Sequence, residues 1–216
     1  MRRFERLWEK VQEEIPGARV LQRSESTFLK VIFGVLGFLV KLFTLWRVKP
    51  NWSGFTTTIS RTMYVPDGFW EDGKDWDDER RYRLLRHELV HMRQFREWPM
   101  KFLARPWLWP INAVIMGFCY IFAFPVIWTF RAKFEREGYT QSMLTRYEIR
   151  GNRSANQKKW YAEHMGKTFG TSVYFWMWTR KAAEKWAMET MEKIERGEIR
   201  NDRDNVDYWP VPITRS

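Results

Sequence analysis

The residues best suited to chemistry lie in one five-residue stretch, His87-Glu88-Leu89-Val90-His91. Residues four apart in a helix lie one above the other, so His87 and His91 could direct their imidazole nitrogens at a single metal ion. Glu88 would then lie beside that ion. There its carboxylate could accept a proton from metal-bound water, whose pKa the ion lowers to about 7. The spacing therefore predicts a zinc site that includes a general base.

Ordinary core histidines are the alternative explanation for this pair. Histidines at the edge of an apolar helix face are commonly buried and hydrogen-bonded without any metal. The chain has only three histidines, however, and two of them occur here at ligand spacing with a glutamate beside the first. This scarcity favours metal binding over a chance match to a five-residue pattern.

The sequence around the motif predicts a helix that turns both histidines inward. Asp77 and Asp78 suit a helix N-terminus, and Pro99 forces the residue before it out of the helical region. Apolar side chains recur at three- and four-residue steps and form one stripe: Leu84, Leu85, Leu89, Met92 and Phe95. The motif lies beside this stripe. Five arginines are expected to occupy most of the remaining surface: Arg81, Arg83, Arg86, Arg93 and Arg96.

A catalytic zinc ion needs a third protein ligand and keeps its fourth position open for water. His164 is the remaining histidine, but it lies in a polar stretch far downstream. Metzincins place a third histidine six residues after the second, and this chain has Glu97 there. Two glutamates occur where the next helix is expected to open, in Phe134-Glu135-Arg136-Glu137-Gly138-Tyr139.

The first motif and this second segment together resemble the gluzincins, zinc peptidases in which a glutamate on a following helix completes the metal site. The resemblance implies that Glu135 is the third ligand and that Gly138 stands at the small residue of the gluzincin pattern. Tyr139 falls where these enzymes often have an aspartate that orients a ligand, so this hydrogen bond would come from a phenol or from elsewhere. Glu137 points about 200° away around a helix and is the alternative ligand.

Residues 55–65 are rich in β-branched and aromatic types and predict one strand of a small sheet, closed by Pro66-Asp67-Gly68. In gluzincins an edge strand at this point commonly binds extended substrate through main-chain hydrogen bonds. One polar face of the strand would suit that role: Thr56, Thr58, Ser60 and Thr62. A strand half-buried against the motif helix explains the same alternation, and we expect a single strand to do both.

Length and composition predict a single metallopeptidase-like domain over residues 1–216. Its expected parts are N-terminal helices in 1–50, a zinc-site core in 51–140 and a helical C-terminal extension with a polar tail in 141–216. The first helix should run to Glu14 and stop at Pro16-Gly17. The expected fold is α+β and mainly helical, with a small antiparallel sheet packed on the active-site helix. A long C-terminal helix is expected over 171–196, ended by Gly197.

An uncharged stretch separates Arg105 from Arg131 and is long enough to cross a bilayer. The expected metal ligands lie on both sides of it and must meet at one ion, and three prolines interrupt it. We therefore expect 106–130 to form an apolar hairpin instead of a single span. The first residues lack the apolar core of a secretory signal. The sequence leaves the location open between the cytoplasm and a virion, with peripheral membrane contact as a further option.

The net charge of +11 and the isoelectric point near 9.9 favour an anionic partner, either nucleic acid or a membrane surface. The many aromatic residues more often form cores and interfaces than platforms for bases. Cys119 is the single cysteine, which excludes a disulfide framework and a thiolate zinc site. Gly166-Lys167-Thr168 resembles the end of a P-loop, but Tyr161 stands where its first glycine is needed, which argues against nucleotide binding.

Two functions of different classes follow from these residues. The first is a zinc-dependent metallopeptidase acting on a peptide or protein, with Glu88 as the general base. Its metal ligands would be His87, His91 and Glu135, and its oxyanion donor Tyr139, with Tyr147 and His164 as alternatives. The second is a virion or assembly protein that keeps this scaffold for its partners in a virion. The Thr-rich strand, the His-Glu-Leu-Val-His stretch and Phe-Glu-Arg-Glu also resemble a set of small tailed-phage proteins. Glu88 favours the enzyme, because metal binding alone has no use for a carboxylate beside His87.

Overall fold

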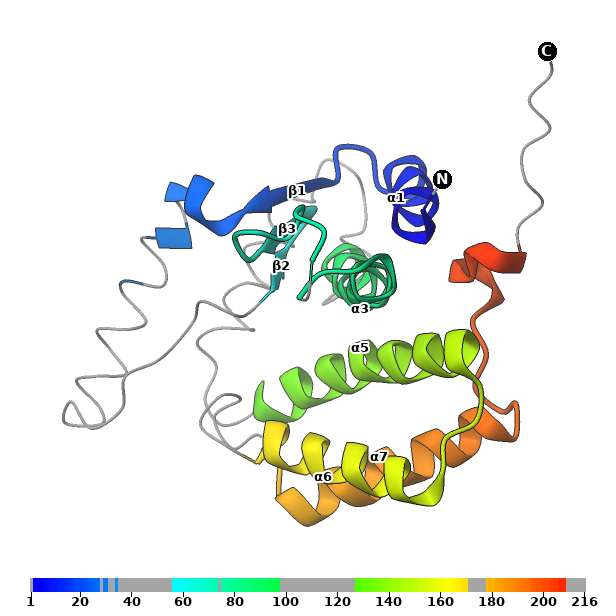
Figure 1. Cartoon of the computed structure of the whole chain (residues 1–216). Helices are drawn as coiled ribbons and strands as arrows, with labels where there is room; N and C mark the ends of the chain where they lie inside the picture. Colours follow the sequence, from blue (N-terminus) through cyan, green and yellow to red (C-terminus); the bar gives the residue numbers. More distant parts are fainter. Residues whose placement is uncertain are drawn as a thin grey trace.

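The computed structural model describes residues 2–27, 29–30, 34, 56–73, 75–97, 127–170 and 178–208. Within these residues the chain is mainly helical with one three-stranded sheet, which confirms the expected α+β class. Figure 1 shows α1 and the sheet on one side of α3, α5 on the other, and the pair α6 and α7 beyond α5. The apolar hairpin expected at 106–130 lies outside the described residues up to position 126, and its last residues begin α5.

Helix α1 (Arg3–Glu14) covers one side of α3 with a single apolar face. Phe4, Leu7 and Val11 recur at three- and four-residue steps on that face and are buried. The helix ends at Glu14, as the sequence predicts, and Gly17 follows with φ of 82°, in the left-handed region that glycine adopts most easily. Strand β1 (Arg19–Gln22) and the 3₁₀ turn η1 (Arg23–Glu25) come next.

The sheet is mixed, whereas the sequence predicted an antiparallel one. Its strand order is β1-β3-β2, where β2 spans Thr57–Ile59 and β3 spans Thr62–Val65. The central strand β3 pairs antiparallel with β2 and parallel with β1. A hairpin joins only neighbouring antiparallel strands, whereas a parallel partner arrives from elsewhere in the sequence. Local residue patterns carry no signal for such a pairing.

Residues 57–65 form a hairpin, so the prediction of a single strand over 55–65 was wrong. Ile59 pairs with Thr62 across a two-residue turn, and Ser60 in this turn has φ of 58°. A non-glycine residue in the left-handed region was not evident from a run of β-forming types. The expected polar face is broken as a result, because Thr58 is buried and Ser60 lies in the turn.

Helix α3 (Asp78–Glu97) carries the motif and has the predicted bounds. The Asp77 carboxylate accepts a hydrogen bond of 2.6 Å from the backbone N–H of Arg80 and so caps the helix. Leu85, Leu89 and Met92 are fully buried in the core shared with α1 and the sheet. Burial of each such side chain stabilises the fold by about 1.5–3 kcal/mol.

The sequence suggested that the arginines of α3 lie on the surface, but two of them are buried. Arg86 is fully buried and pairs with Glu148 of α5. Arg81 is 3% exposed and donates a hydrogen bond of 2.7 Å to the backbone carbonyl of Phe69. Both sides of α3 are therefore covered, one by an apolar core and the other by a polar interface with α5.

The sequence analysis expected the next helix to begin at Phe134, but helix α5 (Ile127–Arg150) begins earlier, at Ile127. Glu135 therefore lies in the interior of the helix. Phe134 packs with Phe95 of α3 in a small cluster of its own, separate from the two larger cores. This contact sets the two helices against each other close to the motif.

Helices α6 (Ala155–Phe169) and α7 (Arg180–Glu195) pack on each other and build the second core with α5. The helix expected at 171–196 begins at Arg180, because Thr179 is extended and its hydroxyl caps Ala182 N at 3.3 Å. Residues 171–177 lie outside the described residues. The predicted end is confirmed: Gly197 has φ of 74°, and its N–H bonds back to Ile194 O at 2.9 Å.

The C-terminal segment, predicted as a polar tail, folds back onto the first core over its described part. It forms the 3₁₀ turns η5 (Asp202–Asp204) and η6 (Val206–Tyr208). Val206 is fully buried in the first core, and the Tyr82 hydroxyl donates a hydrogen bond of 2.9 Å to Asp204 O. Residues 209–216 lie outside the described residues.

Candidate metal centre

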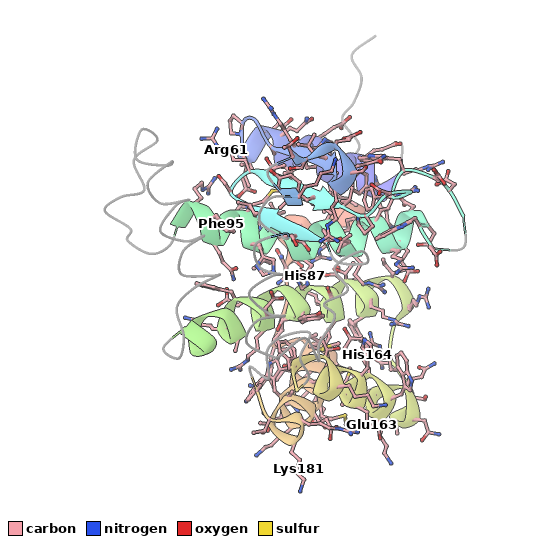
Figure 2. All side chains as sticks on the ribbon, turned by 90° about the vertical axis from the view of Figure 1, so that its left-hand side faces the viewer. Arg61, His87, Phe95, Glu163, His164 and Lys181 are labelled. Atoms are coloured by element: carbon pink, nitrogen blue, oxygen red, sulfur yellow. The ribbon has the colours of Figure 1, made fainter. Side chains whose placement is uncertain are left out.

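Three side chains that could hold a metal ion meet between α3 and α5. They are His87 and His91 of α3 and Glu135 of α5, and each is buried. The two Nε2 atoms are 3.2 Å apart, and Glu135 Oε2 lies 3.7 Å from Nε2 of His87 and 3.8 Å from Nε2 of His91. Figure 2 shows His87 between the two helix ribbons. The expected ligand set is thus brought together.

The separations of these three atoms suit a small divalent cation. When the three distances are taken as the sides of one triangle, its circumradius is about 2.1 Å, which matches the usual Zn–N and Zn–O bond lengths. Two imidazoles and a carboxylate buried together without an ion would bring acceptor atoms close to one another at a cost in free energy. The residues present therefore fit a metal ion.

Hydrogen bonds from neighbouring side chains fix both imidazole rings. Nδ1 of His91 lies 2.8 Å from Gln94 Oε1, an acceptor, so this nitrogen donates and leaves Nε2 with its lone pair toward the centre. Gln94 is held in turn, because its Nε2 donates to Glu137 Oε2 at 2.7 Å. Nδ1 of His87 lies 3.2 Å from the Ser142 hydroxyl. Such outer partners orient metal ligands and raise their basicity.

Gly138 allows α5 to approach the motif helix closely at the site. A Cβ atom at this position would lie 2.8 Å from Cε1 and from Nε2 of His87. Real Cβ atoms do not come that near to another heavy atom. Only glycine therefore leaves room for the His87 ring in this arrangement, which explains why the small residue of the second motif is needed here.

Glu88 is buried beside the three ligands without being one of them. Burial raises the pKa of its carboxyl group to about 7, while His91 and the Thr58 hydroxyl lower it and Glu135 raises it further. The Thr58 oxygen faces this carboxyl group but falls short of a full hydrogen bond, and no described residue provides it with another. A cation held by the ligands would lower the pKa of Glu88 again.

The Tyr139 ring lies against His87, one turn after Glu135. The two ring centroids are 4.9 Å apart and the planes are nearly perpendicular, at 84°. The other side of Tyr139 packs on Phe169 at 5.3 Å. Tyr139 is thus beside the site, although the residue within hydrogen-bond distance of Nδ1 of His87 is Ser142.

The other candidates lie away from the ligands. Glu137 does not join the cluster and anchors Gln94 instead, which excludes it as the third ligand in this arrangement. His164 is exposed and stacks on Trp160 of the same helix. Figure 2 shows it on α6, on the far side of α5 from His87. Tyr147 packs in the core formed by α5, α6 and α7.

The sequence analysis missed both Gln94 and Ser142, and helix periodicity contains a signal for Gln94 alone. Gln94 follows His91 by three residues, a step at which a polar side chain can reach the outer nitrogen of that ring. Ser142 reaches His87 from the other helix, so no spacing along one helix points to it.

Within the described residues, no helix is both long and apolar enough to cross a membrane. Comparison of the chain with protein-family models, curated proteins and solved structures gives no match in any of the three. The function has to be argued from the chemistry of the site itself.

Proposed function

We propose that the protein is a zinc-dependent metallopeptidase of the gluzincin type. One observation carries the proposal: a buried triangle of His87, His91 and Glu135 with a fourth buried side chain, Glu88, beside it and not part of it. Two histidines and a glutamate are the ligand set of catalytic zinc in peptidases. They also hold iron in oxygenases. The adjacent Glu88 favours zinc, because hydrolysis requires a base next to the reacting water.

The zinc ion would polarise the substrate carbonyl and make a bound water molecule acidic. Glu88 would accept one proton from a water molecule as the water oxygen attacks the carbonyl carbon of the peptide bond. Glu88 then delivers that proton to the amide nitrogen as the C–N bond breaks, so the carboxylate is regenerated. A carboxyl group that is buried beside the ligands without being one of them is placed for both steps.

The sheet supplies a place for an extended peptide. Among the described strands β2 lies at an edge of the sheet, and it packs on α3 beside the motif. Thr58 of this strand faces Glu88, so the strand passes next to the general base. A peptide added along this edge through main-chain hydrogen bonds would bring a carbonyl group toward the ligands.

The test measures metal content and peptide hydrolysis on the same preparations. We expect about one zinc per chain, and we expect His87→Ala to remove it. Glu88→Gln should keep the metal and lose at least a hundredfold in kcat, because only the base is removed. Glu163→Gln on α6 is the matched control and should change neither quantity. Iron in place of zinc would overturn the assignment, and metal binding without hydrolysis would favour the virion or assembly protein.

The role of Tyr139 as oxyanion donor stays a prediction and has its own test. Tyr139→Phe keeps the ring that packs on His87 and removes only the hydroxyl group. If the hydroxyl stabilises the oxyanion, kcat should fall by roughly 10²-fold with zinc affinity unchanged. An unchanged kcat would leave Tyr139 with a packing role and assign the donor elsewhere.

A further inference from the structure

Three arginines from different segments lie close enough to Tyr161 of α6 for their charges to act on its hydroxyl group. They are Arg83 of α3, Arg146 of α5 and Arg153 in the turn before α6, called here the arginine cluster. The Arg153 guanidinium lies over the Tyr161 ring, 4.6 Å from its centroid. Tyr161 is buried, which raises the pKa of its hydroxyl, and the charges of all three arginines act on that hydroxyl.

The arginine cluster lacks negative partners among the described residues. Neither Arg83 nor Arg146 forms an ion pair or a hydrogen bond there, and Nη2 of Arg153 is buried without a hydrogen-bond partner. The two nearby carboxylates are engaged elsewhere: Glu79 pairs with Arg150 at 2.8 Å, and Glu195 pairs with Lys158 at 2.8 Å. Positive charge therefore accumulates at this point.

Two other arginines of α3 are neutralised within the described part of the chain. Arg86 pairs with Glu148, and Arg93 with both Glu14 and Asp204. In the cluster, by contrast, burial lowers the pKa of Arg83 and of Arg153, and the charge of Arg146 lowers both further. Like charges held together in a half-buried place cost free energy unless an anion joins them.

We propose that the arginine cluster binds a phosphate group. A phosphate group carries close to two negative charges and several strong acceptor oxygens, enough for more than one guanidinium, whereas a single carboxylate would leave most of the cluster unpaired. Arginine forks match the oxygens of phosphate in pairs. All three side chains are only half-buried, so a ligand can reach them from solvent. Free phosphate provides this charge in one group, whereas the backbone of a nucleic acid provides one negative charge and the same acceptor oxygens at each successive phosphodiester.

Calorimetric titration of the full chain with inorganic phosphate, in a buffer free of other oxyanions, tests the site. We expect saturable binding of one phosphate per chain. Arg146→Gln and Arg153→Gln should each weaken it at least tenfold, since each removes one charge-assisted donor. Arg19→Gln on β1 removes the same charge from an exposed position and should leave binding unchanged. Absence of saturable binding, or equal weakening by Arg19→Gln, would overturn the proposal.

A conservative variant guards against loss of the fold. Arg146→Lys keeps the charge but not the planar fork, so phosphate binding should still weaken several-fold while the thermal unfolding midpoint stays near that of the unchanged chain. Full phosphate affinity in this variant would contradict bidentate recognition. Zinc content measured on the same samples should not change, so this proposal and the proposed function can fail separately.

A competition arm distinguishes the two sources of phosphate. A short single-stranded oligonucleotide without terminal phosphates is added to the phosphate-loaded protein. Displacement of phosphate by the oligonucleotide would assign the site to phosphodiesters, provided that Arg153→Gln loses this binding of the oligonucleotide. The affinity of the protein for the oligonucleotide should then fall steeply as the salt concentration rises. Retention of phosphate would assign the site to the free anion. Oligonucleotide binding that is equally strong in all the cluster variants would overturn the phosphodiester source.

Discussion

Each imidazole of the metal centre is held from behind by one hydrogen bond, and these bonds decide where the ligand nitrogens point. Gln94 binds Nδ1 of His91 at 2.8 Å, and Ser142 lies 3.2 Å from Nδ1 of His87. Gln94 is itself locked by Glu137. A ring with a fixed tautomer and orientation loses less freedom when an ion binds.

Removal of either partner should therefore weaken metal binding without abolishing it. We expect Gln94→Ala and Ser142→Ala each to raise the zinc dissociation constant by about 10 to 100-fold. Glu137→Ala should have a smaller effect in the same direction, because it frees Gln94 only. Competition with a fluorescent zinc chelator measures all three. Unchanged affinity in Gln94→Ala would show that the bond to His91 is not needed for orientation.

The ligands could be predicted from the sequence more readily than their supports. His87, Glu88 and His91 are encoded within one helical turn, and Glu135 follows from resemblance to a second motif. Ser142 needs the relative phase of α3 and α5, which depends on how Phe95 meets Phe134 and how closely Gly138 approaches His87. Such contacts between distant parts of the chain leave no local pattern.

At the scale of elements, the close approach of α5 to α3 depends on glycine at position 138, which has no side chain. The two helices carry all three ligands, so their separation sets the size of the metal site. The bounds of α1 and α3 were predicted from caps and prolines. The turn at Ser60 was not, because its positive φ contradicts the usual preference of serine.

Gly138→Ala should reduce metal affinity more than it reduces stability. The added methyl group would meet the His87 ring at 2.8 Å, and overpacking of this kind costs about 1–3 kcal/mol. Alanine favours a helix over glycine by up to about 1 kcal/mol, which offsets part of the loss in the metal-free protein. We expect the zinc dissociation constant to rise at least tenfold. Gly73→Ala, whose added Cβ would meet nothing within 4 Å, is the control.

At the scale of the whole molecule, Arg93 joins three distant segments. Arg93 belongs to α3 and forms ion pairs with the other two segments. Its partners are Glu14, the last residue of α1, at 2.7 Å, and Asp204 of η5, at 2.6 Å. Burial alone would raise the pKa of both carboxyl groups, but their hydrogen bonds to Arg93 and its charge outweigh burial and hold each pKa below its usual value. The sequence analysis did not predict that the polar tail packs on the core, because this pairing is visible only in the folded chain.

These lowered pKa values predict a loss of stability in acid. The folded protein keeps Asp204 and Glu14 charged below the pH at which the unfolded chain takes up protons, about pH 4. Their contribution is therefore fully present above that pH and disappears as pH falls through the folded pKa values. Urea unfolding of metal-free protein should show this decline.

Asp204→Asn should lower the free energy of unfolding at pH 7 by about 1–3 kcal/mol, because Arg93 loses a charged acceptor inside the fold. The difference from the unchanged protein should shrink as pH falls from about 4 through the lowered pKa of folded Asp204, because this carboxyl group then becomes protonated in the folded protein as well. Asp75→Asn, at an exposed side chain, is the control and should change neither quantity. A difference that stays constant with pH would exclude the carboxylate charge as its cause.

Because Glu135 lies on a different helix from the two histidines, an ion bound by all three would cross-link α3 and α5. About 44 residues separate His91 from Glu135, so an ion held by both would close a loop as a covalent cross-link does, and closing a loop of that length removes chain entropy equivalent to about 4 kcal/mol. Unlike a disulfide, this link opens with a chelator and forms equally well in a reducing compartment. A cut anywhere in the connecting chain would leave α3 and α5 tied by the ion, so metal loading would set how the protein withstands nicking.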